Sequence, residues 1–459
     1  MFPQSLISKT GGHMDLSKLN HVELPLPNGG LVFVIDTGAL IDAESLAMLQ
    51  ALHSRSIDGI KAHLKVLSEK GAGKFIDRFY VGYGHASIGD CGFITIFIEG
   101  VSMLVAKAIQ DSQLYNGQEA STRYIPFDAQ PFIDPEGLRE ILEGWREVYT
   151  SYLSTVQAHV REQNPLREEY DEKDYERAVS ARAFDIMRGF LPAGASTNLA
   201  WTVNLRHAHD RLDLLRHHPL AEVRVVAETI LSALQKAYPN SFGHKRYPDK
   251  EAYNAHWMKT KYYFDPSSCD RKVRNRFDYE QLEGWREELS TRPAKCELPK
   301  QIAECGGLQF EFPLDFGSFR DIQRQRSVAQ RMPRLTPRLG FHSWYLDSLP
   351  KSIRDDVKMR SGELIDRVTR AGISPDTAQY YYPMGLLVAC RITGDLPAHT
   401  YIVELRAQSV VHPTLHEVAL WMADELENRF RDFGLKLYVD REVGRFNVKR
   451  GKQTIELKN

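Results

Sequence analysis

Residues 117–124 read GQEASTRY, which places a carboxylate, a hydroxyl and a guanidinium at alternate positions. In an extended segment this spacing puts Glu119, Ser121 and Arg123 on one face. A guanidinium beside a hydroxyl is suited to binding a phosphate through two hydrogen bonds, and a nearby carboxylate can hold the guanidinium in place. The segment therefore predicts a phosphate site, with a solvated strand end and a surface ion pair as the alternative.

Apolar segments before this motif predict strands and helices in alternation. Residues 93–98 (FITIFI) are β-branched or aromatic almost throughout, which favours a strand. Residues 102–113 predict the helix that leads to the motif. Residues 31–36 predict another short strand, and the apolar residues of 43–67 recur at helical spacing. The motif therefore follows a strand and a helix directly.

The chain after the motif predicts mainly helices, over 138–160, 178–190, 197–216 and 221–237, with Leu191-Pro192 closing the second of them. The third carries a polar cluster in an apolar setting, made of Asn204, Arg206, His207, His209, Asp210 and Arg216. A guanidinium in such a setting needs an acid or an anionic ligand. The alternative is an ion pair within the helix, since Arg206 and Asp210 are spaced i,i+4.

The pattern returns after residue 300, where 308–314 predict a strand like 93–98 and 317–330 predict a short helix. Residues 399–433 echo 197–237, with Glu404-Leu405-Arg406 answering Asn204-Leu205-Arg206. This is a weak tandem duplication with a period near two hundred residues. We therefore expect repeat 1 over 1–240, a connector over 241–300 and repeat 2 over 301–459, as in a fused dimer.

An arginine-rich run covers residues 320–338, with six arginines against one acid. The run has no interleaved aromatic residue and is interrupted by prolines, so a compact phosphate site fits it better than nucleic-acid binding. A solvated basic face is the other alternative.

The composition of the 459 residues is that of a globular protein, with 42% hydrophobic and 26% charged residues. A net charge of −1 gives no overall attraction to nucleic acid or to an anionic membrane. The N-terminus lacks the apolar core of a signal peptide, and no apolar run is long enough to span a bilayer. The five cysteines show no CxxC pair, so we expect no metal site and a cytoplasmic protein with free thiols.

In this order the motifs resemble those of the flavin-dependent thymidylate synthases. That family has an early histidine, the motif R-H-R-x-x-S-x-N-E-x-S-x-R-Y, an L-P element, a helix bearing N-x-R and an A-x-x-E-I-R stretch. The matching residues here are Gly84-His85, Glu119, Ser121, Arg123, Tyr124, Leu191-Pro192, Asn204, Arg206 and 221–224. The likeness is close over 80–240 and weak over 300–430.

The departures from the family pattern are complementary between the repeats. Residues 111–113 (DSQ) stand where the family has R-H-R, and the helix arginine that contacts the pyrimidine falls at Leu215, one residue before Arg216. Repeat 2 keeps Arg324-Gln325-Arg326 in place of R-H-R and has lost the rest of the motif. A fused pair could therefore assemble sites from nucleotide contacts in repeat 1 and flavin contacts in repeat 2.

The resemblance implies an α+β fold with two tandem diverged repeats, each a small, mostly antiparallel sheet packed on long helices. It implies reductive methylation of dUMP to dTMP, with methylenetetrahydrofolate as the carbon source, FAD as the cofactor and NADPH as its reductant. The implied substrate-binding residues are Gln118, Glu119, Ser121, Arg123 and Arg216, of which Ser121 and Arg216 are the catalytic ones. The implied cofactor-binding residues are His85, Asn204, Arg206, Arg324 and Arg326. A homodimer would reproduce the family's four-fold set of domains.

Two other functions are compatible with the same residues. One is a related enzyme that modifies another pyrimidine nucleotide with altered cofactor use. The other is a catalytically dead nucleotide-binding homologue, which would bind nucleotide through Arg123 without turnover.

Overall fold

The structure is a computed structural model that describes residues 21–35, 42–54, 60–82, 85–264, 266 and 270–453. The chain divides into two compact units. The first comprises residues 1–100, 116–118 and 198–256, and the second comprises 101–115, 119–197 and 257–459. The predicted repeat boundaries stay a prediction, and the units cut across them because much of the predicted repeat 1 packs with the C-terminal half.

The first sheet has five strands in the order β1-β2-β3-β5-β4. β1 pairs antiparallel with β2, and β2 pairs antiparallel with β3 in a register that sets Phe33 opposite Phe97. In the first unit, helix α9 packs on β1 and β2, and α1 packs on α2. The bounds are β1 (His21–Pro25), β2 (Leu31–Ile35), β3 (Phe93–Ser102), β4 (Asn116–Glu119), β5 (Ser196–Asn204), α1 (Ala43–His53), α2 (Ile60–Lys70), α8 (Leu205–Leu215), α9 (Ala221–Ala237) and α10 (Pro248–Lys261).

The first half of one predicted helix is a strand in the structure. The helix expected over 197–216 is β5 followed by α8, because Leu199, Trp201 and Val203 point inward at every second position, a period of two. The Asn204 side chain then accepts a hydrogen bond from the amide of His207 and starts α8.

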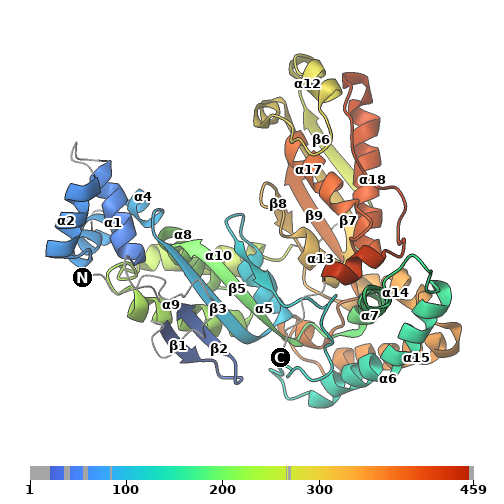
Figure 1. Ribbon diagram of the computed structural model, residues 1–459. Coiled ribbons are helices and arrows are strands. Elements are labelled where there is room, and N and C mark those ends of the chain that lie inside the picture. The colour runs from blue at the N-terminus through green and yellow to red at the C-terminus, as the bar shows by residue number, and fades with distance from the viewer. Residues whose placement is uncertain are drawn as a thin grey trace. The chain divides into compact units, whose positions relative to one another are not determined.

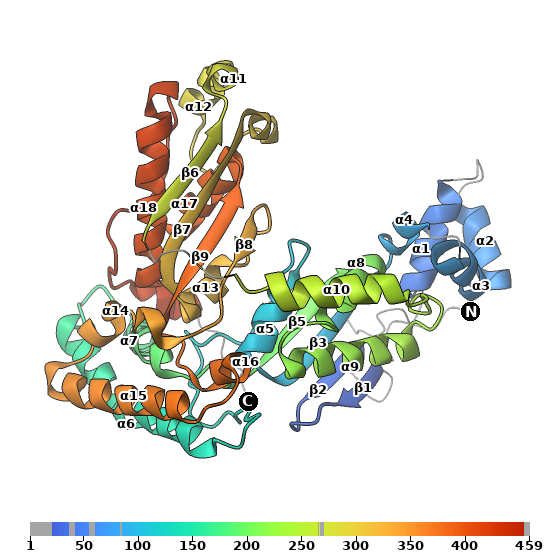
Figure 2. The same cartoon turned by 180° about the vertical axis from the view of Figure 1, so that it is seen from behind.

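The second sheet has four antiparallel strands in the order β6-β7-β9-β8 (Figures 1 and 2). Helices α17 and α18 pack on each other and on β7. The predicted connector over 241–300 supplies β6, an edge strand of this sheet. The bounds are β6 (Lys272–Phe277), β7 (Gly306–Asp315), β8 (Ala329–Arg331), β9 (Leu387–Gly394), α13 (Phe316–Ile322), α17 (Leu396–Arg406) and α18 (Pro413–Phe430).

Long helices complete the second unit. The amphipathic pattern of 138–160 is confirmed as α6, which packs on α7 and α15 and buries Trp145. The Trp145 indole donates a hydrogen bond of 2.9 Å to the carbonyl of Tyr381. The bounds are α5 (Met103–Gln110), α6 (Arg139–Gln163), α7 (Glu172–Met187), α14 (Ser343–Asp347), α15 (Lys351–Arg370) and α16 (Pro375–Ala378). The α+β class with two antiparallel sheets is therefore confirmed.

The two repeats follow the same local plan. Ser102 ends β3 and caps α5, and Asp315 ends β7 and caps α13. Asn204 caps α8 after β5, and Asp395 caps α17 after β9. The structural counterpart of Asn204 is therefore Asp395. The alignment of Asn204 with Glu404 was wrong, because Glu404 lies near the C-terminal end of α17.

Within the second unit, the segment after α7 and the segment after α16 bind each other through reciprocal backbone hydrogen bonds. Gly194 donates to the carbonyl of Tyr380 and Gly385 donates to that of Gly189, both at 2.8 Å. The neighbouring pairs, Ala193 with Tyr382 and Met384 with Leu191, bond at 2.9 and 2.8 Å. The predicted L-P element at Leu191-Pro192 is thus one half of a two-fold junction between the repeats.

This junction predicts a sensitivity to small side chains. A Cβ at Gly385 would lie 2.8 Å from the carbonyl oxygen of Gly189 and 2.5 Å from the Phe341 ring. We expect Gly385→Ala to lower the free energy of unfolding by about 1–3 kcal/mol, because the two backbones must separate.

The matched control is Gly362→Ala, in the exposed interior of α15, where an added Cβ meets nothing within 4 Å. This substitution should raise stability by about 0.5–1 kcal/mol through helix propensity. Urea unfolding of the three proteins measures both effects, and equal midpoints for Gly385→Ala and wild type would contradict the junction's role.

Candidate functional site

The motif segment changes conformation after its carboxylate. Strand β4 ends at Glu119, and the chain then turns, with the amide of Ile125 donating to the carbonyl of Ser121 at 3.2 Å. The expectation of one extended face for Glu119, Ser121 and Arg123 is therefore wrong. Ser121 accepts a hydrogen bond from the amide of Arg123 at 3.3 Å, and Gln118 is exposed.

The carboxylate that holds Arg123 is Asp185, at the C-terminal end of α7, and not Glu119. Nε of Arg123 donates to Oδ1 of Asp185 at 2.7 Å and Nη2 donates to Oδ2 at 3.2 Å. Nη2 also donates to the carbonyl of Val410 at 3.0 Å. This two-pronged geometry fixes the guanidinium plane.

Asp185 is buried, and a second guanidinium from the C-terminal segment binds it. Nη2 of Arg450 donates to its Oδ1 at 2.8 Å, and Nη1 donates to its Oδ2. Burial alone would raise the pKa of the Asp185 carboxyl, but Arg123 and Arg450 hold it well below its ordinary value. Two cations on one carboxylate leave a net positive charge at this point.

The neighbouring Arg182 responds to the same positive field. Burial lowers the pKa of its guanidinium to about 10, with Arg450 and Arg123 adding to the decrease against the opposing effect of Asp185. Burial and the charge of Arg188 likewise hold the pKa of His412 well below its ordinary value, so its ring is neutral at pH 7. His412 donates from Nε2 to the carbonyl of Asp185 at 3.1 Å.

Glu119 joins the two repeats inside the second unit. Its Oε2 accepts from Nε2 of Gln110 at 2.6 Å, and its Oε1 accepts from Nη2 of Arg320, which belongs to α13. The Glu119 and Arg320 side chains are 4% and 7% exposed. A buried, hydrogen-bonded ion pair of this kind fixes the relative position of the groups that carry it.

Arg406 is a further cation that sequence reasoning missed. It lies eleven residues after the cap Asp395 (406 − 395), as Leu215 lies eleven residues after the cap Asn204 (215 − 204). Arg406 therefore stands in repeat 2 where the family's helix arginine would fall at Leu215 in repeat 1. The capping aspartate at 395 is the sequence signal that could have found it.

Arg406, Arg123 and Arg324 influence one another electrostatically. Arg406 donates from Nη2 to the carbonyl of Asp321 at 2.6 Å. Burial lowers the pKa of Arg406, Asp321 opposes the decrease, and Arg324 and Arg123 add to it. Arg324 is exposed and makes no hydrogen bond or ion pair within the described part of the chain, and Arg326 is also exposed. We call Glu119, Arg123, Arg320, Arg324 and Arg406 the composite anion site.

Arg188 and Asp321 form an ion pair next to Arg406 of this site. Arg188 is fully buried and donates to Oδ2 of Asp321 at 3.1 Å and to Oγ of Ser318 at 2.8 Å. Burial would raise the pKa of the Asp321 carboxyl, and Arg188 and Arg123 lower it below its ordinary value. Asp321 therefore stays ionised and neutralises part of the charge that surrounds it.

The predicted cofactor residues of the first unit have partners of their own. Nε of Arg206 donates to Oδ1 of Asp90 at 2.7 Å, so its ion-pair partner is Asp90 and not Asp210. Asn204 also donates to Asp90, at 3.4 Å, while its oxygen caps α8. His85 is exposed and precedes α4 (Ala86–Gly89), and Gly84 lies outside the described residues.

Arg216 is buried among carboxylates of the first unit. Its Nη2 donates to Asp213 at 2.8 Å and to Glu251 at 3.0 Å. This guanidinium is therefore already neutralised. Its assignment to the pyrimidine stays a prediction, and Arg406 in the second unit offers a guanidinium without a carboxylate hydrogen bond.

The position of the missing R-H-R in repeat 1 is occupied by a different interaction. Asp111 accepts from the buried Nζ of Lys107 at 3.0 Å, and Lys107 also donates to the Tyr262 hydroxyl at 3.0 Å. An acidic residue here would repel an anionic cofactor, whereas its counterpart in repeat 2, Arg324, would attract one.

Comparison with protein families matches residues 40–240 to the family described as thymidylate synthase complementing protein. The matched segment contains the motif, the L-P element and β5-α8, and in this part the chain is similar to that family.

Relatives extend the similarity over nearly the whole chain. A UPF0159 protein of Chlamydia muridarum is 24% identical, with 88% of each chain covered. A UPF0159 protein of Thermoplasma acidophilum is 22% identical over 86% of this chain and 93% of the relative. A flavin-dependent thymidylate synthase of Pyrococcus furiosus is 26% identical over 37% of this chain and 65% of the relative. The two-repeat length is therefore shared with the UPF0159 proteins.

The described residues contain no helix that is long and apolar enough to cross a membrane. They also contain no group of three or more His, Cys, Asp or Glu side chains that could hold a metal ion.

The buried Asp185 predicts both a large stability effect and a defined pH dependence. Asp185→Asn would leave Arg123 and Arg450 without their carboxylate, and we expect a loss of about 3–5 kcal/mol in the free energy of unfolding. Because the folded-state pKa is lowered, the contribution is complete above the unfolded-state pKa of about 3.9 and is lost as the pH falls through the folded-state value.

Urea unfolding of both proteins between pH 3 and pH 7 measures this difference. The advantage of wild type should be constant from pH 7 to about pH 5 and should shrink below about pH 4. Glu140→Gln removes an exposed pair with Arg367 and should stay within about 0.5 kcal/mol of wild type. A difference between wild type and Asp185→Asn that shrank above pH 5 would contradict the low pKa.

Proposed function

We propose that this protein catalyses the flavin-dependent reductive methylation of dUMP to dTMP, with methylenetetrahydrofolate and NADPH as co-substrates. The observation that carries the proposal is the buried Glu119–Arg320 pair. It joins the motif segment of repeat 1 to the helix that precedes Arg324-Gln325-Arg326 of repeat 2, so the retained halves of one signature meet in one compact unit.

Arg123 would bind the nucleotide phosphate. Its Nε and Nη2 donate hydrogen bonds to Asp185, which holds the guanidinium rigid. Arg450 binds the same carboxylate and neutralises it further. A pre-oriented guanidinium loses little side-chain entropy when an anion binds. Ser121, in the same turn, would add a nucleotide contact, and Gln118 stays a predicted nucleotide contact.

Arg406 would act on the pyrimidine ring. Its side chain is bound to the carbonyl of Asp321 and, among the described residues, to no carboxylate oxygen, so its positive charge stays available. A fixed cation stabilises the negative charge that develops on the ring when carbon 5 becomes nucleophilic. By the same argument Arg216 is the weaker candidate, because Asp213 and Glu251 already neutralise it.

Arg324 and Arg326 fit an anionic cofactor such as FAD. Both are exposed, and Arg324 has no ion-pair partner within the described residues, as a diphosphate-binding guanidinium requires. When bound, the flavin would supply hydride transfer, and the protein would supply position and electric field. His85, Asn204 and Arg206 stay predicted flavin contacts, and a homodimer stays the predicted assembly.

An absorption spectrum of the purified protein, before and after addition of FAD and dUMP, tests the proposal first. We expect a bound-flavin spectrum that shifts when dUMP is added, followed by dTMP formation in the presence of the two co-substrates. Absence of flavin binding under every condition would favour the related enzyme with altered cofactor use. Binding of dUMP and FAD without turnover would favour the catalytically dead homologue.

Two variants separate the two halves of the site. Arg324→Ala/Arg326→Ala should weaken FAD binding at least tenfold and leave apo-protein binding of dUMP within about threefold, because charge-assisted contacts are worth about 1.5–3 kcal/mol each. Arg123→Gln should do the reverse. Equilibrium titrations of each ligand measure both constants, with Arg370→Gln on the exposed face of α15 as the control. Normal flavin binding by the double variant would exclude the sharing of one site between the repeats.

A further inference from the structure

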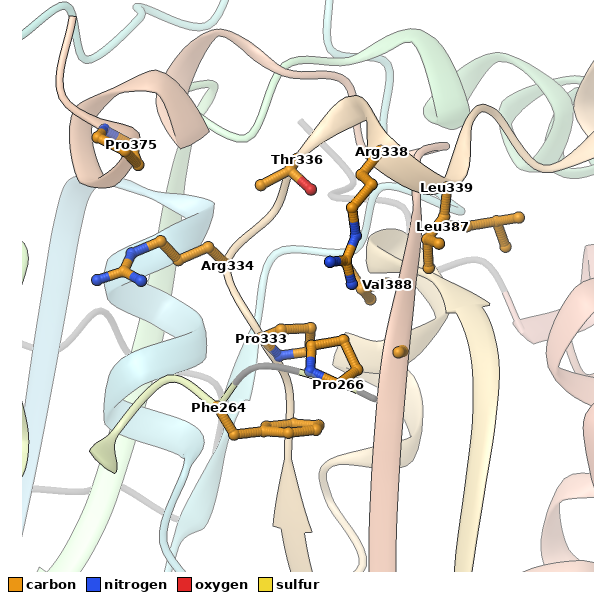
Figure 3. A pocket seen from close by; sticks show the side chains of 11 residues that line it. Phe264, Pro266, Pro333, Arg334, Thr336, Arg338, Leu339, Pro375, Leu387 and Val388 are labelled. Carbon is orange, nitrogen blue, oxygen red and sulfur yellow. The ribbon is translucent and has the colours of Figure 1, made fainter. Parts of the chain in front are cut away.

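Repeat 2 contains a cavity of about 230 Å³ where repeat 1 carries its motif turn. Strand β8 corresponds to β4, and the residues after β8 line the cavity together with Leu387 and Val388 of β9. Figure 3 shows the Arg338 side chain extending toward Val388 and Pro333, among the residues that line the cavity. The cavity lies wholly within the second unit.

An arginine–aspartate ion pair lies beside the cavity, and it resembles the Arg123–Asp185 ion pair of repeat 1. Nε of Arg334 donates to Oδ1 of Asp376 at 2.6 Å. Asp376 lies three residues before the turn that begins at Gln379 (379 − 376), as Asp185 lies three residues before the turn that begins at Arg188 (188 − 185). Repeat 2 therefore also has a loop arginine that binds an aspartate three residues before a turn, although it has lost the motif itself.

The surroundings of the cavity carry an excess of positive charge. Arg338 makes no hydrogen bond or ion pair in the part of the chain that the structure describes. Arg331 and Arg391 lie 4.9 and 4.7 Å from the centre of the Phe264 ring, which lines the cavity. Among the described residues, the carboxylates that pair with these guanidiniums are Glu311, 2.9 Å from Arg391, and Asp376. Asp111, whose charge acts on Arg331, is itself paired with Lys107.

Most of the remaining described lining is apolar. Phe264, Pro333, Leu387 and Val388 contribute carbon surface, and none of the described lining residues is a carboxylate. Apolar walls exclude water and strengthen the attraction between a guanidinium and an anion. The volume admits one ring with a charged group and is small for a whole nucleotide.

We propose that this cavity binds a small organic oxyanion, a phosphate or carboxylate carried on a flat ring, and that it is separate from the composite anion site. Arg338 supplies the free guanidinium, and Arg334, held by Asp376 and 4.9 Å from the Tyr263 ring centre, supplies further N–H donors in a fixed position. The ring lies against the prolines and Val388. The second repeat thus has a ligand site of its own, and is not only a non-functional copy of repeat 1.

Calorimetric titration of the full-length protein with phenyl phosphate, benzoate, inorganic phosphate and benzyl alcohol tests this site. We expect phenyl phosphate or benzoate to bind at least tenfold more tightly than inorganic phosphate, which lacks the ring, and than benzyl alcohol, which lacks the charge. The tighter of the two ring anions identifies the head group. Failure of both to bind would overturn the proposal.

Three single variants assign the binding to the cavity. Arg338→Gln, at an exposed side chain, should weaken the preferred ring anion about tenfold, since a hydrogen bond to a charged group is lost. Arg123→Gln disables the composite anion site and should leave this affinity unchanged, as should Arg370→Gln, an exposed residue of α15. Weakening by Arg123→Gln alone would place the ligand in the composite anion site and refute the second site, whatever the outcome of the dUMP measurements.

Discussion

The reciprocal backbone hydrogen bonds between residues 189–194 and 380–385 are the constraint on which the second unit depends. Backbone amides and carbonyls that are buried must be paired, so these two segments cannot separate without leaving unsatisfied groups. In the same unit, Arg320 of repeat 2 meets Glu119 of repeat 1. The Glu119–Arg320 ion pair is therefore buried in the second unit next to this junction's segments of the chain, and the proposed site would be anchored by it.

The charges of this site are balanced in favour of an anion. The buried side chains of Glu119 and Asp185 and the half-buried Asp321 hold the arginines in place, and each of these acids faces at least one guanidinium at hydrogen-bond distance. Within the described residues, Arg324 and Arg406 make no hydrogen bond to a carboxylate, so no such bond neutralises their positive charge. Since an uncompensated buried charge is costly, such a surplus is stable only where solvent or an anionic ligand reaches it. The acids therefore fix the position of the arginines, and the remaining positive charge is left to attract an anion.

Local patterns in the sequence predicted the elements but not the partners. The β-branched run at 93–98 and the amphipathic period of 138–160 are strong local signals, and both elements are found. The alternation of Leu199, Trp201 and Val203 was also present, and was mistaken for the start of a helix that begins only after Asn204. The acid that holds Arg123 lies 62 residues away, and Arg450 joins from the C-terminal segment, so only the tertiary fold could identify them.

Fusion of two repeats explains why each could lose half of a signature. In a symmetric dimer of identical chains, one substitution alters every copy of the site, so Asp111 in place of an arginine would remove a cofactor contact everywhere. In a fused chain the same substitution affects one half, and Arg324 persists in the other. The half freed in this way still contains an ordered ion pair, in which Nε of Arg334 donates to Asp376 as Nε of Arg123 donates to Asp185. An ordered ion pair beside a largely apolar cavity is a physical basis for a ligand site of its own in the second half.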